Sequence, residues 1–358
     1  MSFYDALQAD PAVLKQKIAG ASDKRQKAWF IAAITVRAAL LAAFAVAAIS
    51  LMNGLFGSAN SNMAVVVFCI FLCIRFVDFD YCVKDSIINL AVIFLILYIS
   101  PLAVRQAPPL LALLINFVSA GLILLMACEK PEMGNGGLYM FGYLFLTGSG
   151  VDEKAFIQRG IMTAACFAVC AVLFYCKHRE KNKEKRFLDI LKGIRLSDEK
   201  RMWQLKTALG ISAFYFIGTL LGLPRLMWAA FACSSLLTAY SAKLKERAKD
   251  RVIGAVGGTG LFYIIWQLIP QSLSSALGIF SGFCLGFCGT YRAKTVFNCL
   301  GALMAAVSIY GLTEASGIRI FNNAAGVIFA CAFVWVWEKA AARISSFSGD
   351  ADLGERAE

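Results

Sequence analysis

The sequence predicts an all-α polytopic membrane protein of about twelve transmembrane helices, arranged as two parallel six-helix repeats (a pseudo-dimer). Hydrophobic residues make up 59% of the 358 residues and charged residues 16%, whereas soluble domains average about 45–50% and about 25%. The apolar residues form blocks of about 15–22 residues, the length that crosses a bilayer core. Short basic segments separate these blocks, an arrangement that records how a chain is oriented in a membrane.

Residues 1–29 are predicted to form a cytoplasmic N-terminal segment. This segment is polar and lacks the layout of a cleaved signal peptide, so the first span is expected to stay in the mature chain. Asp10 and Pro11 have the residue types that begin a helix, and they predict a short amphipathic helix through Ile18.

Twelve apolar segments follow. The first repeat, residues 30–176, has predicted spans near 30–52, 62–76, 86–103, 109–127, 136–149 and 157–176. A basic cytoplasmic linker, residues 177–204, leads to the second repeat, residues 205–340. Its predicted spans lie near 205–223, 226–241, 252–269, 272–290, 295–312 and 323–338. A polar cytoplasmic tail, residues 341–358, follows.

The charges of the connecting segments support this number of spans. Basic segments are retained in the cytoplasm, so Lys and Arg should collect in alternate connections. They do so in segments 15–27, 75–84, around 130, 177–206, 243–251, 292–294 and 339–343. The opposite loops carry one basic residue or none, except residues 151–160, which carry two basic and two acidic residues. Both termini are therefore expected on the cytoplasmic side.

Weak internal similarity supports the two repeats. When the chain is shifted by about 165 residues, Lys84-Asp85 recurs as Lys249-Asp250, and Leu146-Thr147 recurs as Leu312-Thr313. Features keep their order across both halves, as expected for a repeated architecture. Six spans per repeat is an even number, so both repeats enter the membrane from the same side and are parallel.

Several classes of protein are excluded or disfavoured. The net charge of +12 would suit nucleic-acid binding, but the basic residues lie in short loops between apolar blocks, so no nucleic-acid partner is expected. His178 is the single histidine, which excludes a His-based metal site or catalytic dyad. The Cys residues are interpreted as small packing residues. We therefore expect no cofactor, no metal and no enzymatic activity.

Glycines are spaced for helix packing in two of the predicted spans. Gly254 and Gly258 form a G-x-x-x-G at the start of one span, and Gly278, Gly282 and Gly286 fall four apart in the next. In lipid, small residues let helix backbones approach closely, and this contact supplies the packing. The five glycines are predicted to be packing or hinge positions, and the two interpretations, rigid packing and sliding during a transport cycle, remain open.

The segment MWAAFACSSLLTAYSAKLKERAKDRVIGAVGGTG resembles the signature of the fusaric acid resistance and aromatic acid exporter family of bacterial inner-membrane proteins. Trp228, Arg251, Gly254 and Gly258 match the pattern of that family, while Ala255 stands where Thr is usual. The resemblance covers about residues 205–340. It extends to residues 30–176 through the repeat alone, and there Met63, Ser86 and Asn89 replace the Trp, Arg and first Gly.

The resemblance implies a multi-pass inner-membrane exporter of small organic, often aromatic, anions that is usually energised by protons. It also implies that a periplasmic adaptor of the membrane-fusion type could be a partner, besides the lipid bilayer. Plant malate channels are similar six-span proteins that pair as dimers, which agrees with the pseudo-dimer.

The candidate substrate-binding residues are positive or amide side chains in or near the spans, since an anion needs Lys, Arg or helix N-termini along its path. Arg251 stands at a helix mouth beside the glycines, Arg37 lies about two turns inside its span, and Arg159 lies near the outer end of another. Asn116 and Asn298 fall within spans. Interpretations without substrate binding stay open, because Arg37 could extend to the headgroups and each Asn could form a hydrogen bond between helices.

Three functions remain open from the sequence. The first is a proton-coupled exporter of organic anions. The second is a passive organic-anion channel, favoured because no Asp or Glu lies at the middle of a predicted span. The third is a non-transporting membrane scaffold or assembly protein, suggested by the glycines and the basic cytoplasmic surfaces.

Overall fold

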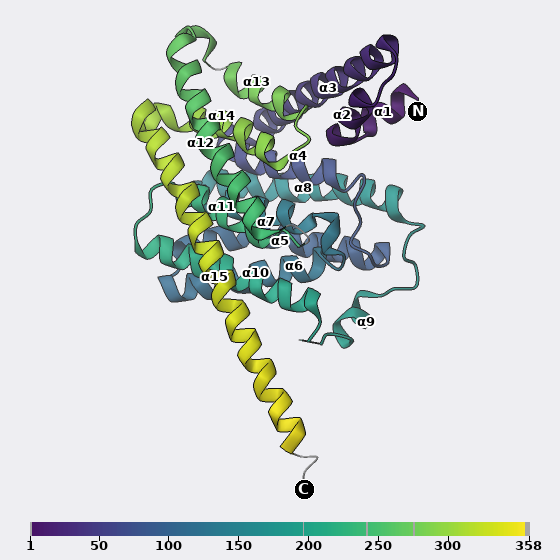
Figure 1. Ribbon diagram of the computed structural model, residues 1–358, viewed down its shortest axis with the longest axis vertical. Helices are drawn as coiled ribbons and strands as arrows, with labels where there is room; N and C mark the ends of the chain where they lie inside the picture. Colours follow the sequence, from purple (N-terminus) through teal and green to yellow (C-terminus); the bar gives the residue numbers. More distant parts are fainter. Residues whose placement is uncertain (1, 196, 241–242, 275, 355–358) are drawn as a thin grey trace.

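The computed structural model of the chain describes the backbone of residues 2–195, 197–240, 243–274 and 276–354, and the side chains of these residues except Gln271 and 344–354. Every regular element in these ranges is helical, which confirms the all-α prediction (Figure 1). The elements are α1 (Phe3–Gln8), α2 (Pro11–Ala19), α3 (Lys24–Phe56), α4 (Ser61–Cys73), α5 (Val83–Gln106), α6 (Pro109–Ala127), α7 (Asn135–Thr147), α8 (Glu153–His178), α9 (Phe187–Lys192), α10 (Glu199–Leu220), α11 (Leu226–Leu237), α12 (Leu244–Leu268), α13 (Ala276–Leu285), α14 (Tyr291–Tyr310) and α15 (Leu312–Gly354), with 3-10 turns at Ser58–Asn60, Pro131–Met133 and Gln271–Leu273.

Seven of the helices in the described ranges are long and apolar enough to cross a membrane: α3, α5, α6, α8, α12, α14 and α15. Each of the twelve predicted spans overlaps one helix, but several of these helices are short. The 12 residues of α11 extend over about 18 Å, which is less than a bilayer core of about 30 Å. The chain is thus a multi-pass helical membrane protein, and the number of twelve spans stays a prediction.

The N-terminal helices follow the expected local rules. The Asp10 carboxylate accepts a hydrogen bond from the Ala12 N–H at 2.7 Å, and Pro11 is the first residue of α2. This confirms the predicted short helix. α1 and α2 pack on α3, where Leu14 and Phe30 belong to one small apolar cluster.

Several helices begin before their predicted spans, and the difference is largest for α12 and α15. α12 begins at Leu244, so its first two turns contain the basic run that was expected to be a loop. Lys, Glu, Arg and Ala are strong helix formers, so this run continues the apolar helix. α15 begins at Leu312, eleven residues before the predicted span. Gly311, at φ 77°, ends α14 in the left-handed region, and no Pro interrupts the residues that follow it.

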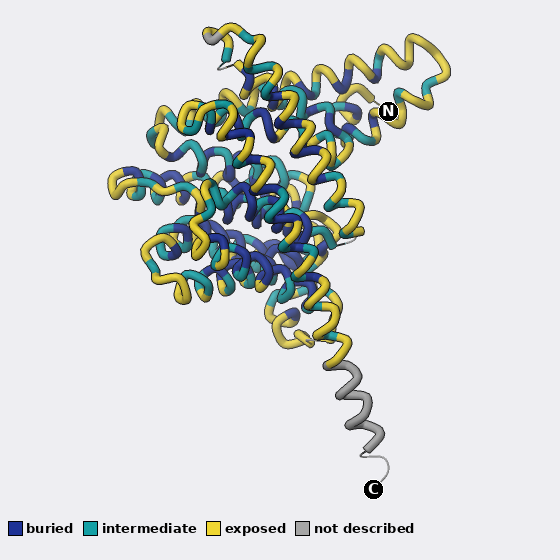
Figure 2. The backbone as a smooth tube through the Cα atoms, turned by 60° about the vertical axis from the view of Figure 1, so that its left-hand side comes forward, coloured by how far each residue is buried: buried dark blue, intermediate teal, exposed yellow. Residues whose placement is uncertain are grey.

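The two halves of the chain share one large core. Buried residues of α4 to α7 join buried residues of α10, α11 and α15, and this core appears as the dark blue centre of Figure 2. The short helices α7 and α11 lie inside it and contact each other through Phe141, Phe145 and Phe231. A second core joins α12, α14 and α15 around Phe262 and Leu303. In Figure 1, α12 and α15 run side by side.

The basic linker is bound to the segments that the charge pattern placed on the same side. Arg186 donates two hydrogen bonds to the Asp85 carboxylate, at 2.9 and 3.0 Å, and Lys185 pairs with Asp80 at 2.7 Å. The Glu129 carboxylate accepts hydrogen bonds from Lys200 at 2.6 Å and Arg201 at 2.8 Å. Connections 75–85 and 128–134 therefore meet the linker at one end of the first half.

Candidate functional site

The second half contains two buried arginines that no carboxylate neutralises within the described ranges. Arg251 on α12 is 7% exposed, and Arg319 on α15 is 4% exposed. Neither forms an ion pair with an acidic side chain there. A buried charge in a membrane bundle costs free energy, and such residues usually mark a substrate or ion pathway. We refer to Arg251, Arg319, Asn323, Trp228 and Tyr291 as the arginine cluster.

Three helices fix the position of Arg251. Its Nε donates a hydrogen bond to the Asn323 Oδ1 on α15 at 2.9 Å, and its Nη1 donates to the Tyr291 hydroxyl on α14 at 3.4 Å. The Asn323 Nδ2 in turn donates to the backbone carbonyl of Arg319 at 2.8 Å. Asn323 therefore connects the two arginines and holds the Arg251 guanidinium in a single direction.

Arg319 is held by aromatic stacking. Its guanidinium carbon lies 4.9 Å from the centroid of the Trp228 ring, and that of Arg225 lies 5.6 Å from the same centroid. Trp228 is 3% exposed. A cation above an aromatic face is stabilised by about 1–2 kcal/mol when water is excluded, so the ring supports a positive charge that has no acidic partner.

Several buried polar atoms in this region lack a hydrogen-bond partner within the described part of the chain. They include Arg319 Nε, Ser316 Oγ and Asn322 Oδ1 on α15, and Thr259 Oγ1 on α12. Each unpaired buried polar group costs about 1–3 kcal/mol. Arg319 lies three residues from both Ser316 and Asn322 and is a helix-surface neighbour of each. This part of α15 offers donors and acceptors that the described residues do not satisfy.

The members of the arginine cluster lie at different positions along their helices. Asn323 stands eleven residues after Leu312 and fourteen before Trp337, after which Glu338 and Lys339 follow. At 1.5 Å per residue these intervals are about 17 Å and about 21 Å. Asn323 thus lies near the middle of the apolar length of α15, whereas Arg251 follows the charged first two turns of α12 and Tyr291 is the first residue of α14.

Two glycines bring α12 against α14 beside Arg251. A Cβ atom at Gly254 would lie 2.7 Å from Thr295 Cβ and 2.9 Å from the Arg292 carbonyl oxygen. A Cβ atom at Gly258 would meet the backbone of Val296. No larger residue fits without moving α14, so this contact sets the distance between Arg251 and Tyr291.

The other three predicted glycines differ in whether another helix packs against them. A Cβ atom at Gly286 would lie 2.6 Å from Ala38 Cβ on α3, so Gly286 joins the two halves of the chain. At Gly278 and Gly282 an added Cβ atom would meet nothing within 4 Å in the described structure. A packing role for these two would require a neighbour outside the described residues, and it stays a prediction.

The five predicted substrate-binding residues are not brought together. Arg37 is half-buried and donates to the Gly286 carbonyl at 3.3 Å. Asn116 is buried and accepts a hydrogen bond from the Tyr143 hydroxyl at 2.8 Å. Asn298 is exposed on α14. Of the five, Arg251 is the residue in the arginine cluster.

Arg159 belongs to a separate buried site in the first half. It is 3% exposed, and its Nε donates to the Asn60 Oδ1 at 3.0 Å. The Asn60 Nδ2 donates to the carbonyls of Phe56 and Ala155, at 3.0 Å each. Arg159 therefore ties α8 to the start of α4, although its Nη2 has no partner within the described residues.

Sequence reasoning missed Arg319, Asn323 and Tyr291. The stretch that contains Arg319 was interpreted as an outer loop, because the predicted span began at residue 323. A signal was present, since Arg319 and Asn323 are four apart and share a helix face with no helix-breaking residue between them. Extending the helix back to Gly311 would have placed both inside it.

Residues 212–336 match a family model described as fusaric acid resistance protein-like. The match begins within α10 and ends within α15, so it contains the whole arginine cluster and both glycines of the α12–α14 contact. It confirms the family resemblance for the second half of the chain. The comparisons find no curated protein and no solved structure that matches the chain.

Proposed function

We propose that this protein exports small organic anions across the inner membrane of a bacterium, and that the arginine cluster binds the anion on its way. The observation that carries the proposal is the pair of buried arginines, Arg251 where the apolar part of α12 begins and Arg319 within α15, which lack acidic partners in the described structure. Both belong to the region that matches the fusaric acid resistance protein-like family model.

The chemistry of the cluster suits a carboxylate attached to an aromatic ring. A guanidinium donates two parallel hydrogen bonds to one carboxylate, and it does so more strongly than a neutral donor. The rings of Trp228 and Tyr291 add apolar surface beside the charges. Trp228 is well suited to stacking, because aromatic pairs contribute about 0.5–1.5 kcal/mol beyond the burial of their area.

The contacts between the two halves support the proposed two-repeat architecture. α6, the fourth helix of the first repeat, packs on α10, the first helix of the second. Reciprocally, α13, the fourth helix of the second repeat, packs on α3, the first helix of the first. Reciprocal contacts of this kind are those of a two-fold interface. The proposed architecture is therefore a pseudo-dimer with parallel halves, and both termini on the basic, cytoplasmic side.

A passive anion channel is the second candidate, and the placement of acidic residues favours it. In the described parts of the seven candidate spans, Asp and Glu stand within a few residues of an end of the apolar segment. Proton-coupled transporters commonly use a carboxylate inside the membrane. The proposal of proton coupling therefore rests on the family resemblance, whereas a passive pathway would need no such group.

Transport by purified protein distinguishes these candidates. Proteoliposomes that contain the protein, with an imposed pH gradient, should accumulate 4-hydroxybenzoate above the level in protein-free liposomes. Saturable uptake that requires the gradient supports the exporter, whereas unitary currents in planar bilayers support the channel. If neither uptake nor current occurs with any of a panel of aromatic and aliphatic carboxylates, both candidates are excluded and the membrane scaffold is left.

A further inference from the structure

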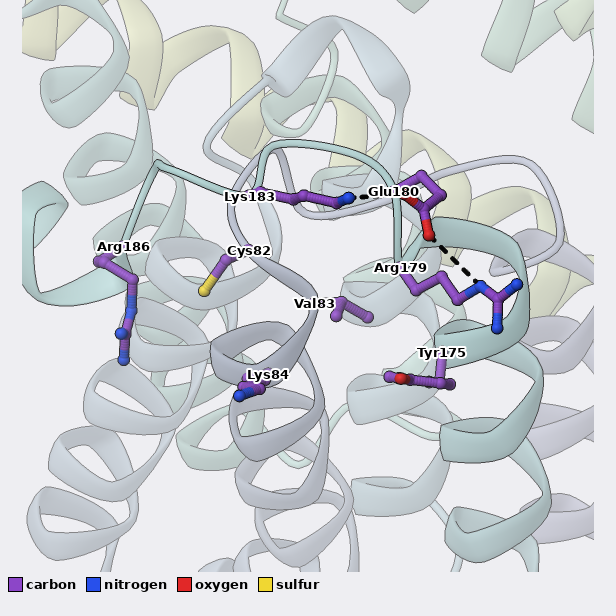
Figure 3. Close-up of a pocket in the computed structure, with 8 residues that line it drawn as sticks. All are labelled: Cys82, Val83, Lys84, Tyr175, Arg179, Glu180, Lys183 and Arg186. Atoms are coloured by element: carbon purple, nitrogen blue, oxygen red, sulfur yellow. Dashed lines mark hydrogen bonds and ion pairs between the residues drawn. The ribbon is translucent and has the colours of Figure 1, made fainter.

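A basic pocket lies at the end of the first half, where α5 begins and α8 ends. It has a volume of about 430 Å³ and opens to the surface. Its lining includes Lys84 on α5, Tyr175 on α8, and Arg179, Lys183 and Arg186 on the segment that follows α8 (Figure 3). The pocket is separate from the arginine cluster, which belongs to α11, α12, α14 and α15.

The pocket carries more positive than negative charge. Glu180 is the acidic residue of its lining, and it pairs with Lys183 at 2.6 Å and with Arg179 at 3.5 Å, as the dashed lines of Figure 3 mark. Arg186 is paired with Asp85. Lys84 is exposed and has no carboxylate partner in the described structure.

The N-terminus of α5 adds to the positive potential of the pocket. Cys82 precedes the helix and supplies no side-chain hydrogen bond to its first N–H groups. A long helix carries about half a positive charge at this end. Asp85 lies in the first turn of α5, and its charge is paired with Arg186. The pocket therefore combines a helix terminus with Lys84, which has no acidic partner in the described structure, and with three basic side chains that are paired with Glu180 or Asp85. This combination suits a phosphate group.

Apolar surface continues from the pocket along both helices. Ile88, one turn after Lys84 on α5, is 62% exposed, and Val172, one turn before Tyr175 on α8, is 65% exposed. Residues three or four apart share a helix face, and α5 and α8 pack against each other. A molecule with its phosphate in the pocket would thus meet apolar side chains on the membrane side and basic side chains on the other.

We propose that this pocket binds the phosphate of an anionic phospholipid, such as phosphatidylglycerol, and that one acyl chain of the lipid lies over Ile88 and Val172. Free phosphate would be attracted by the same charges, but it would gain nothing from the exposed apolar stripe. Basic pockets at the end of membrane helices recognise anionic headgroups in this way. The proposal does not depend on the transport of organic anions.

Native mass spectrometry of the purified full chain tests the proposal, with phosphatidylglycerol and phosphatidylcholine added in equal amounts. The chain should retain phosphatidylglycerol preferentially. Lys84→Gln should weaken this binding about fivefold, because each basic residue near an anionic lipid contributes about 1 kcal/mol. Lys177→Gln is the matched control, since Lys177 is exposed on the same helix as Tyr175 but does not line the pocket. It should change binding less than twofold.

A second variant and a soluble competitor separate the lipid from free phosphate. Ile88→Gln should weaken phosphatidylglycerol binding about threefold, because it removes apolar contact with the acyl chain. Glycerol phosphate at millimolar concentration should not displace the lipid. Equal retention of both lipids, equal losses from Lys84→Gln and Lys177→Gln, or displacement by glycerol phosphate would each overturn the proposal. All three substituted side chains are exposed, and a melting curve for each variant verifies that the fold is kept.

Discussion

In the first half of the chain, Ser86 and Asn89 occupy the positions that Arg251 and Gly254 occupy in the second half. The Ser86 hydroxyl donates to the Tyr81 carbonyl at 3.2 Å, and the Asn89 amide donates to the Tyr81 hydroxyl at 2.7 Å. That hydroxyl then donates to the Met126 carbonyl at 2.7 Å. This network in the first half is neutral, and its polar groups are paired with one another. It therefore stabilises the bundle and leaves few donors or acceptors for a ligand.

The equivalent region of the second half is charged and incompletely paired. Arg251 and Arg319 are buried without a carboxylate, and polar atoms of Thr259, Ser316 and Asn322 lack partners among the described residues. A fully paired polar network specifies a fold, whereas unpaired buried groups are a cost that function can explain. The comparison supports the proposal that transported organic anions bind at the arginine cluster of the second half, whereas the buried Arg159 of the first half is tied to Asn60.

The two halves also differ in how closely their helices approach each other. Gly258 corresponds to Ile93, which is completely buried on α5. A large side chain therefore separates α5 from its neighbours where a glycine brings α12 onto α14. The close approach, like the arginine pair, belongs to the second half.

The largest expected effect comes from removing the charge at Arg251. Arg251→Gln should raise the apparent KM for aromatic carboxylate uptake by ten- to a hundredfold, because hydrogen bonds to a charged group contribute about 1.5–3 kcal/mol. Ser86→Ala, at the equivalent position of the first half, should change it less than twofold. Uptake into proteoliposomes measures both variants. Equal effects at the two positions would refute the assignment of binding to the second half.

The next effect concerns the contact between α12 and α14. Gly258→Leu should lower the stability of the protein in detergent by about 1–3 kcal/mol, since the new side chain would meet the Val296 backbone and overpacking has costs of this size. Gly260→Leu, two residues away, should have little effect, because a Cβ atom there meets nothing within 4 Å. Thermal unfolding followed by tryptophan fluorescence compares the two. Similar losses would show that glycine spacing does not control this interface.

Trp228→Leu tests whether the arginine cluster selects aromatic over aliphatic carboxylates. Loss of the ring removes the stacking surface for Arg319 and for the substrate, so affinity for an aromatic carboxylate should fall about fivefold relative to an aliphatic one. Trp335→Leu is the control, because Trp335 is exposed on α15. If both acids lose affinity equally, the ring positions Arg319 without contacting the substrate.

The smallest expected effect is a pH-dependent change in stability at the linker. Burial alone would raise the pKa of Glu129, but the hydrogen bond from Lys200 and the charges of Arg201, Lys200 and Lys185 outweigh it, so the pKa lies below its ordinary value. A carboxyl with a lowered pKa in the folded state stabilises the fold above its unfolded pKa, about 4.3, and loses this contribution as the pH falls through the folded value.

The protein should therefore lose linker-dependent stability below about pH 4, in proportion to the protonation of Glu129. Glu129→Gln should remove part of this pH dependence and lower the melting temperature at pH 7. Glu184→Gln, an exposed residue of the same linker, should leave both unchanged. Melting curves at pH 7 and pH 3 provide the comparison, and an unaltered pH dependence in Glu129→Gln would contradict the assigned ion pairs.

The fold class and the place of the helices follow directly from composition and apolar blocks, because bilayer thickness limits the length of each apolar segment. The helix ends were harder to predict. The basic run before Arg251 looked like a loop, but its residues are good helix formers and join α12. Likewise, polar residues after Leu312 indicated a loop, although Ser316 and Arg319 of that stretch are buried in the protein.

The candidate site could be predicted in part. Arg251, Trp228 and Gly258 were identifiable because they lie within one continuous stretch with a family pattern. Arg319 and Asn323 are about 70 residues away in sequence, and only the packing of α15 on α11 and α12 brings them to the same place. A single sequence carries periodicity along a helix, but it does not state which faces of distant helices meet.

The most direct measurement is a cryo-electron microscopy structure of the protein with a brominated aromatic carboxylate. The account predicts density for the carboxylate within hydrogen-bonding distance of the Arg251 and Arg319 guanidinium groups, with the ring beside Trp228, and no such density near Ser86. Density for the acid in the first half would contradict it. So would a protein that transports the acid while side chains fill the space between Arg251 and Arg319.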